Sequence, residues 1–138
     1  MSEQISQHTL NNFTGTENYI RFSRLFKNHL LTDGAHFVAN KCKAYWLFDA
    51  IASYHARIMR NPRLQEMQIW ILQKLDNSQV VLKCFEDTGE GEKPKITQKI
   101  EYSDFFNTFT DDEIKFYVMP QPTEEGKTLW IIMLPSEY

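Results

Sequence analysis

The pattern of apolar and polar residues divides the chain into a helical first half and a second half of β-strands. The clearest helical stretch is residues 44–58, AYWLFDAIASYHARI, which we expect to end before Pro62 because proline disfavours helical backbone in the preceding residue. One apolar face has helical spacing and is formed by Leu47, Ile51, Tyr54 and Ile58. Apolar residues also surround most of the first two turns, which is typical of a helix buried on more than one side. We therefore expect this helix to be central, with the other elements packed on it.

Shorter helices are predicted before the central one. A helix from Asn18 onward is indicated by apolar residues at helical spacing, namely Tyr19, Phe22, Phe26 and Leu30. Residues 32–34, TDG, then have the chemistry of a turn. Thr32 or Asp33 can cap a short helix over Ala35–Cys42.

Alternating apolar and polar residues predict strands in the second half, at residues 67–75, 80–85, 96–102, 114–119 and 129–134. Asp76–Gln79 separates the first two strands as a hairpin turn. Residues 67–75 and 129–134 are apolar on both faces, so we expect their second face to be at least partly covered. The predicted fold is α+β, with N-terminal helices packed on one face of an antiparallel, meander-like sheet of four to five strands.

The length of 138 residues predicts a single globular domain over 1–138, with a polar and flexible segment at 1–12. The chain starts without a basic and apolar leader, and no apolar stretch approaches 18 residues, so we expect a cytoplasmic protein that does not span a membrane. Cys42 and Cys84 are far apart, which predicts reduced thiols and no zinc or disulfide framework. Glu86–Lys95, EDTGEGEKPK, is predicted to be an exposed acidic loop.

Asp49 is a carboxylate in the middle of the predicted central helix. A carboxylate among apolar groups costs several kcal/mol unless it finds hydrogen-bond donors. One interpretation is structural: Asp49 accepts hydrogen bonds from Thr14, Thr16 or backbone N–H groups of a loop folded over the helix. The other interpretation is a catalytic acid or base.

The net charge of −3 is distributed unevenly along the chain. Residues 1–65 carry eight Lys or Arg and four Asp or Glu, whereas residues 66–138 carry seven and fourteen. A basic half can bind an anionic partner. The residues that would bind a nucleic acid are Arg21, Arg24, Lys27, Arg57, Arg60 and Arg63. The same residues also suit solvated helix faces, and the acidic second half opposes polyanion binding.

The chain contains none of the common phosphate-binding, nucleophile-elbow or zinc-protease motifs. His29, Asp33 and His36 have the residue types of metal ligands, but their spacing across a turn does not predict a metal site. We therefore expect neither a metal nor another cofactor. The weak candidates for catalysis by a small hydrolase are Glu17, Asp33, His36 and Asp49, which would have to converge in one pocket.

Four separated blocks of sequence are shared with a known group of proteins. They are residues 13–19, FTGTENY; 32–34, TDG; 44–53, AYWLFDAIAS; and 134–138, LPSEY. In these blocks the chain resembles a family of short uncharacterised proteins, with a domain of unknown function, from bacteria and their phages and mobile elements. The resemblance runs from Phe13 nearly to the end of the chain and implies no activity, substrate or cofactor.

Three functions are therefore compatible with the sequence. The first is a non-catalytic module that binds another protein, or a second copy of itself, because aromatic residues are abundant and edge strands can pair. The second is the small hydrolase, and the third is the nucleic-acid binder.

Overall fold

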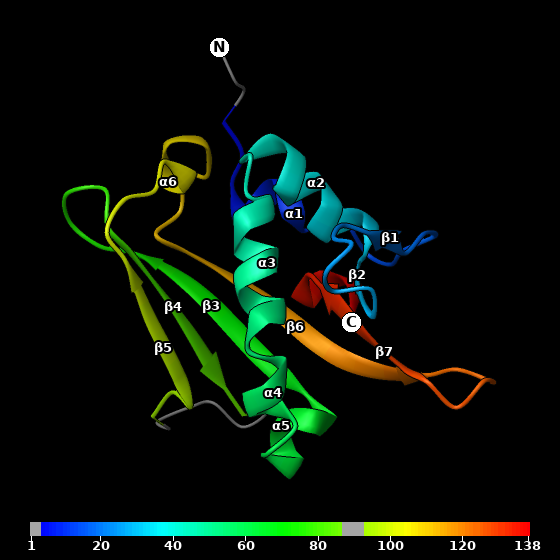
Figure 1. Ribbon diagram of the computed structural model, residues 1–138. Helices are drawn as coiled ribbons and strands as arrows, with labels where there is room; N and C mark the ends of the chain where they lie inside the picture. The colour runs from blue at the N-terminus through cyan, green and yellow to red at the C-terminus, as the bar shows by residue number, and fades with distance from the viewer. Residues whose placement is uncertain (1–3, 87–92) are drawn as a thin grey trace.

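The computed structural model describes residues 4–86 and 93–138, and these form one sheet with helices around it (Figure 1). The strands are β1 (Ile20–Arg21), β2 (His29–Leu31), β3 (Gln68–Lys74), β4 (Val80–Phe85), β5 (Ile96–Ile100), β6 (Glu113–Pro122) and β7 (Thr128–Met133). The helices are α1 (Gln7–Leu10), α2 (Asp33–Lys41), α3 (Tyr45–Ser53), α4 (His55–Ile58), α5 (Pro62–Glu66), α6 (Phe105–Thr108) and the terminal 3-10 turn η1 (Pro135–Glu137). The predicted α+β class is confirmed.

The sheet has seven strands in the order β1-β2-β7-β6-β3-β4-β5 within the described residues. Strands β3, β4 and β5 form an antiparallel meander, and β6 and β7 form a hairpin beside β3. Strand β2 lies parallel to β7, with His29 opposite Trp130. The sheet is therefore mixed, and it is larger than the predicted four to five strands because the first half contributes β1 and β2.

Helix α3 lies across one face of the sheet, with α2 and α4 on the same side (Figure 1). The predicted helix over residues 44–58 is interrupted at Tyr54, where α3 ends and α4 begins. Thr32 caps α2, as predicted, by accepting a hydrogen bond from the Ala35 N–H. Asn61 caps α5 in the same way and Pro62 occupies its first turn, so the chain re-enters a helix after the predicted stop.

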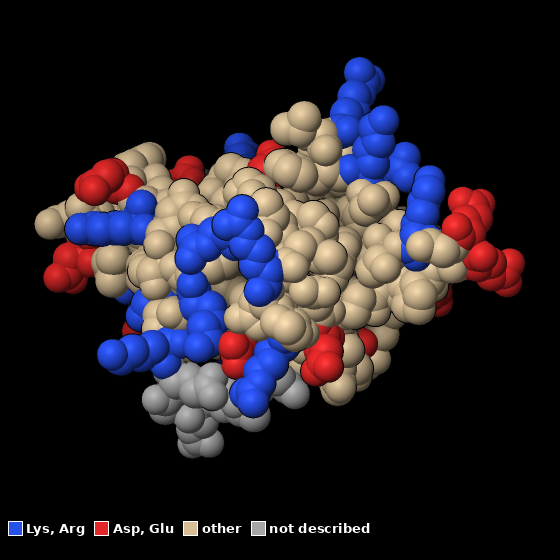
Figure 2. All heavy atoms as spheres, turned by 60° about the horizontal axis from the view of Figure 1, so that its bottom comes forward, with Lys and Arg blue, Asp and Glu red and all other residues tan. Residues whose placement is uncertain are grey.

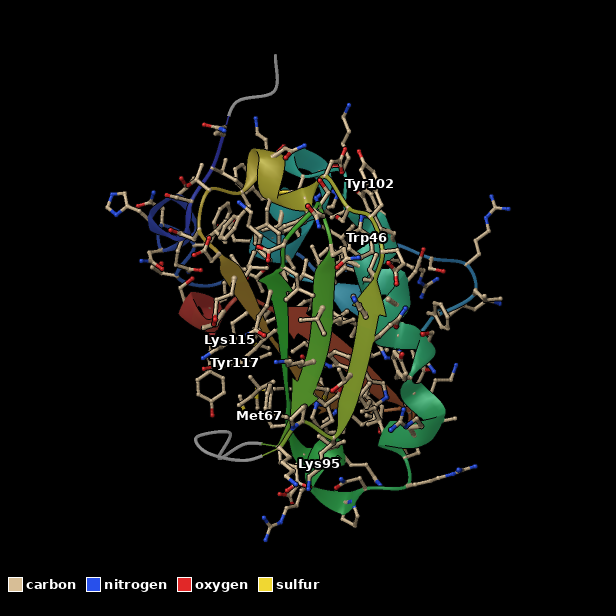
Figure 3. All side chains as sticks on the ribbon, turned by 90° about the vertical axis from the view of Figure 1, so that its left-hand side faces the viewer. Trp46, Met67, Lys95, Tyr102, Lys115 and Tyr117 are labelled. Atoms are coloured by element: carbon tan, nitrogen blue, oxygen red, sulfur yellow. The ribbon has the colours of Figure 1, made fainter. Side chains whose placement is uncertain are left out.

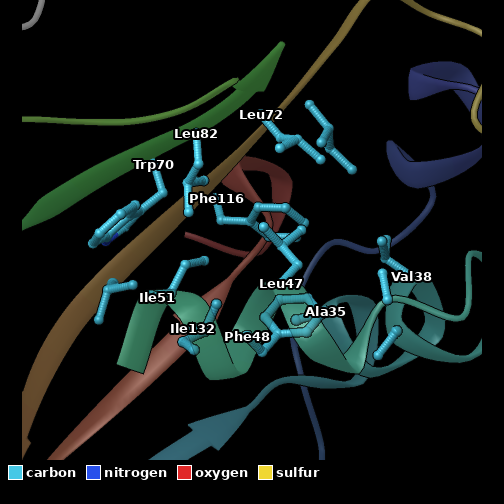
Figure 4. Close-up of a cluster of buried hydrophobic side chains, with 14 of the residues drawn as sticks. Ala35, Val38, Leu47, Phe48, Ile51, Trp70, Leu72, Leu82, Phe116 and Ile132 are labelled. Atoms are coloured by element: carbon cyan, nitrogen blue, oxygen red, sulfur yellow. The ribbon is translucent and has the colours of Figure 1, made fainter. Parts of the chain in front are cut away.

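The core forms where α3 faces the middle of the sheet (Figure 4). Leu47 and Phe48 are fully buried, and the Phe48 ring lies 5.2 Å from the Phe116 ring in an edge-to-face arrangement. The strand residues that meet this helix are Trp70, Leu72, Leu82 and Ile132. The apolar side of this helix packs in the core as predicted, but its other side, with Tyr45, Asp49 and Ser53, is exposed, so the helix is not buried on more than one side.

Residues 18–30 do not form the predicted helix. Ile20 and Arg21 form β1, and His29–Leu31 forms β2, which pairs with β1 on one side and β7 on the other. Between them the Ser23 hydroxyl accepts hydrogen bonds from the N–H groups of Leu25 and Phe26 and stabilises a turn. Pairing with a distant strand outweighs a helical pattern that lacks the support of a long helix.

The ends and connections also differ from the sequence predictions. Residues 7–10 form α1, Leu10 is fully buried, and Ile5 pairs with Phe109, so residues 5–10 of the predicted flexible segment 1–12 are packed, and residues 1–3 lie outside the described residues. Helix α6 follows β5, so the helices are not confined to the first half of the chain. Of the predicted acidic loop Glu86–Lys95, residues 87–92 lie outside the described residues, whereas Glu86 is buried.

Candidate functional site

The N-terminus of α2 is the point at which three of the four sequence blocks meet. The Glu137 carboxylate accepts hydrogen bonds from the Thr32 hydroxyl at 2.6 Å, the Gly34 N–H at 3.1 Å and the Leu134 N–H at 3.0 Å. This carboxylate therefore satisfies donors at a helix N-terminus, where negative charge is favoured. The contact joins the end of the chain to α2.

The FTGTENY block binds the other side of the same turn. The Asp33 carboxylate accepts hydrogen bonds from the Glu17 N–H at 3.0 Å and the Asn18 amide at 3.4 Å, and the Thr16 hydroxyl accepts one from the Asp33 N–H at 2.9 Å. The hydrogen bond from the Glu17 N–H, with smaller contributions from Asn18 and Thr16, holds the pKa of the Asp33 carboxyl below its ordinary value. These bonds fix the loop to α2, and they occupy both oxygens of Asp33.

Asp49 does not contact that loop, contrary to the structural interpretation of the sequence. Its side chain is exposed on the outer face of α3 and makes no hydrogen bond or ion pair with the described residues. The apolar residues beside it in sequence are buried because they lie on the opposite face of the helix, so Asp49 needs no partner. The loop binds Asp33 instead.

The four weak catalytic candidates do not share a pocket in the described structure. Glu17 and Asp33 line one shallow depression beside the FTGTENY loop, and Asp49 lines another beside α3. His36 lines neither and contacts the Asn40 side chain at 3.3 Å. The arrangement provides no paired acid and base.

A pair of histidines that the sequence analysis did not single out together lies beside Trp130. His29 is buried on β2 and its ring centroid lies 5.3 Å from that of His55 on α4, while both rings pack against Trp130. Burial, and then the proximity of His55, lowers the pKa of His29 to about 4, and burial also lowers the pKa of His55. The His55 Nδ1 atom is buried without a hydrogen-bond partner among the described residues. The pairing depends on the β2–β7 contact, for which the sequence carries no local signal.

No metal site is evident in the part of the chain that the structure describes, since it contains no cluster of three or more His, Cys, Asp or Glu side chains with metal-binding geometry. Cys42 and Cys84 are buried, unbridged thiols. Burial, and then the negative charge of Asp104, raises the pKa of Cys42 to about 12, and burial also raises the pKa of Cys84. Neither thiol therefore has the character of a nucleophile.

The basic residues predicted for nucleic-acid binding do not form one continuous surface. Arg21, Arg24 and Lys27 belong to β1 and the β1–β2 loop, whereas the other three belong to α4, α5 and the turn between them. Figure 2 shows basic side chains in separate groups with uncharged surface between them. In the second group, Arg63 pairs with the buried Glu86 carboxylate at 3.5 Å, and Lys95, which is outside the group, pairs with it at 3.7 Å.

Within the described residues, the face of the sheet opposite α3 carries apolar side chains that no long helix covers, and the terminal Tyr138 packs against Tyr117 with ring centroids 5.8 Å apart. Figure 3 shows Lys115 and Tyr117 projecting from this side, away from α3 and α4. The strand register places Ile69 between Phe85 and Tyr117, and it places Ile71 between Lys83 and Lys115. The half-buried apolar residues of this surface, here called the outer sheet face, are Ile69, Ile71, Phe85, Tyr117, Met119, Leu129 and Met133.

The outer sheet face is unusual because the solvated face of a sheet normally carries polar residues in alternation with the core. Ile131 and Leu30 lie in register with Met119 on the same face and are themselves buried by their neighbours. Contiguous apolar surface of this kind marks interaction sites in soluble proteins. The sequence indicates this face in advance, because residues 67–75 and 129–134 are apolar on both faces.

The fold and these surfaces define a small α+β protein in which helices α2, α3 and α4 cover one face of a mixed sheet, and no long helix covers the other face in the described ranges. The chain belongs to the family DUF6876, a family of unknown function, whose model matches residues 4–138. The match confirms the inferred resemblance to a family of unknown function. Neither the curated proteins nor the solved structures include a significant match to the chain. No helix in the described residues is long and apolar enough to cross a membrane.

Proposed function

We propose that this chain is a non-catalytic protein-interaction module that pairs with a second copy of itself through the outer sheet face. The observation that supports this function is the set of half-buried apolar side chains on β3, β4, β6 and β7, at positions where a solvated sheet carries polar ones. The hydrolase and nucleic-acid hypotheses have no comparable support, because their residues are dispersed.

The size of the face suits a specific interface. Strands lie about 4.8 Å apart and rise about 3.4 Å per residue, so the four strands β4, β3, β6 and β7 span on the order of 450 Å² of flat surface. Side chains enlarge this area, and a typical stable interface buries about 800 Å² per partner. Sheet-on-sheet packing of two such faces would also remove their apolar side chains from water.

The charges on this face favour one orientation of the second copy. Lys83 and Lys115 lie toward one end of the strands, and the β6–β7 turn at the opposite end carries Glu124 and Glu125. A two-fold axis that lies between the two facing sheets, parallel to them and perpendicular to the strands, reverses each strand end for end. It brings the lysines of one copy toward the glutamates of the other and keeps like charges apart.

The first test is the oligomeric state measured by sedimentation equilibrium. We expect the wild-type chain to form dimers, and the double variant Ile71→Thr with Met119→Thr to dissociate at least tenfold more readily, because threonine keeps the strand but removes apolar contact. Met59→Thr is the matched control: Met59 is 48% exposed beside α4, on another surface, and its replacement should leave the dimer unchanged. A wild-type chain that stays monomeric at millimolar concentration would exclude the proposal.

The second test addresses the orientation. Lys115→Glu alone should weaken the dimer, and adding Glu124→Lys and Glu125→Lys should restore it, since the charges are then exchanged across the same contact. Circular dichroism checks that each variant is folded. If the two glutamate substitutions do not restore the dimer that Lys115→Glu weakens, this orientation is wrong, although the proposal of self-association itself still stands.

A further inference from the structure

A shallow groove of about 500 Å³ lies along the outer face of α3, on a different side of the molecule from the outer sheet face. Trp46 and Asp49 of α3 form its floor, Leu25 and Phe26 of the β1–β2 loop form one wall, and Gln98 and Ile100 of β5 form the other. Leu25 is 83% exposed, so its apolar side chain is accessible at this wall. The groove therefore combines apolar walls with one carboxylate.

The wall formed by β5 is also the end of the sheet. Strand β5 pairs with β4 alone in the described sheet, so its second edge has no strand partner. One end of this edge is occupied, because the Arg57 guanidinium donates to the Lys95 carbonyl at 3.1 Å. The Tyr54 hydroxyl donates to Gln98 Oε1 at 2.7 Å and holds that side chain on the helix side of the sheet. Toward Ile100, no side chain or strand among residues 4–86 and 93–138 bonds to this edge. Tyr102, just beyond it, is 72% exposed, and Figure 3 shows Tyr102 and Trp46 at this end of the molecule.

An open strand edge selects an extended backbone, because unpaired N–H and C=O groups are satisfied by the addition of another strand. Alternate side chains of such a strand would point toward α3 and meet the apolar walls of the groove. Asp49 is exposed there and has no ion pair among the described residues, so a cationic side chain complements it.

We propose that β5 and α3 bind an extended segment of a partner protein, which adds to the edge of β5 and carries apolar side chains and a lysine or arginine. The apolar side chains lie against Trp46 and Leu25, and the cation lies against Asp49. The proposal is independent of the outer sheet face, so a monomeric chain and a dimeric chain both retain the groove. A dimer presents two grooves and would bring two partner segments together.

The test begins with a random twelve-residue peptide library displayed on phage and selected on the immobilised full-length chain, with the Asp49→Lys variant selected in parallel. We expect the wild-type chain to enrich peptides with alternating apolar residues and at least one lysine or arginine, and the variant to lose them. Failure of the wild-type chain to enrich any peptides beyond those that the variant enriches would overturn the proposal.

Enriched peptides are then synthesised with a fluorescent label and titrated by anisotropy. Asp49→Lys should weaken binding at least tenfold, whereas Asp76→Lys, which changes an exposed carboxylate in the β3–β4 turn, should not change it. Methylation of alternate backbone amides in the peptide should also weaken binding at least tenfold, because it blocks strand addition without altering side chains. Equal affinity for the methylated peptide, or for the Asp49→Lys chain, would refute binding at the β5 edge. Loss of self-association in the Asp49→Lys chain would show that a second copy occupies the groove instead.

Discussion

Gly34 lies where the first turn of α2 meets the carboxylate of Glu137. A Cβ atom at this position would lie 2.6 Å from Glu137 Oε1 and 2.6 Å from Leu134 Cδ1, closer than atoms can approach without a shift. The close approach allows the Gly34 N–H to donate to the carboxylate. At this residue, glycine is required by the contact with the C-terminal turn.

Replacing Gly34 therefore tests the junction of the sequence blocks. Gly34→Ala should lower the free energy of unfolding by about 1–3 kcal/mol, because the added methyl group displaces the Glu137 carboxylate. Urea denaturation measures the change. Gly15→Ala is the matched control, since no atom lies within 4 Å of its added Cβ, and it should change stability little. If both variants unfold alike, Glu137 does not hold the junction.

The second residue-scale prediction concerns His29 and the pH dependence of stability. Burial, and then the proximity of His55, lowers the pKa of His29 from 6.5 to about 4, so the unfolded chain binds the proton more tightly than the folded chain. The stabilisation is complete above pH 6.5 and is lost as the pH falls toward 4, and one pKa unit corresponds to about 1.4 kcal/mol. We expect a loss on the order of 2–3 kcal/mol across this window.

The measurement is urea denaturation between pH 7 and pH 4 for the wild-type chain and two variants. His29→Phe keeps a ring beside Trp130 and should flatten the pH dependence, whereas His8→Gln removes an exposed imidazole and should preserve it. An unchanged slope in His29→Phe would mean that other groups titrate in this range.

At the scale of elements, two turns contain residues whose backbone has a left-handed conformation. Asn77 and Ser78 join β3 to β4 with φ values of 58° and 62°, a left-handed backbone that suits Asn-Gly better than Asn-Ser. Gly126 in the β6–β7 turn has φ of 82° and nothing within 4 Å of an added Cβ. Its requirement for glycine therefore comes from the backbone alone.

Substitutions in these two turns should change the free energy of unfolding in opposite directions. Ser78→Gly should raise the free energy of unfolding by about 0.5–1 kcal/mol by relieving the left-handed serine, and Gly126→Ala should lower it by about 1 kcal/mol. Thermal or urea denaturation of both variants provides the comparison. A loss of stability in Ser78→Gly would indicate that the greater freedom of glycine in the unfolded chain outweighs the relief.

For the whole molecule, the two buried thiols report on the integrity of the core. Cys42 is 4% exposed behind α2 and Cys84 is fully buried on β4, so they monitor distant parts of one structure. The pKa of Cys42, raised to about 12 by burial and then by Asp104, also suppresses its reactive thiolate at neutral pH.

Both thiols should therefore be inert to a disulfide reagent in the native chain and react together when the chain unfolds. Absorbance of the released thiolate should count two thiols per chain in 6 M urea and close to none in buffer. Rapid labelling of one thiol without denaturant would show that its part of the structure opens separately from the rest.

Parts of the candidate site could be predicted from the sequence. The family was inferred from a resemblance in four blocks, and the TDG turn with a cap at Thr32 or Asp33 was predicted from local chemistry. The meeting point of the blocks was not predicted, because Asp33 rather than Asp49 binds the FTGTENY loop and Glu137 arrives from the far end of the chain. The open β5 edge and the His29–His55 contact likewise join residues distant in sequence.

The sequence by itself determined the features that depend on periodicity and local backbone chemistry: the central helix, strands β3 to β7, the hairpin turn and the α+β class. Tertiary structure alone decided that residues 18–30 enter the sheet, because parallel pairing of β2 with β7 is a contact across about a hundred residues that leaves no local pattern. It also decided which apolar face of the sheet the helices cover. Both faces of β3 and β7 are apolar, and the choice between them follows from how α3 packs against the assembled sheet.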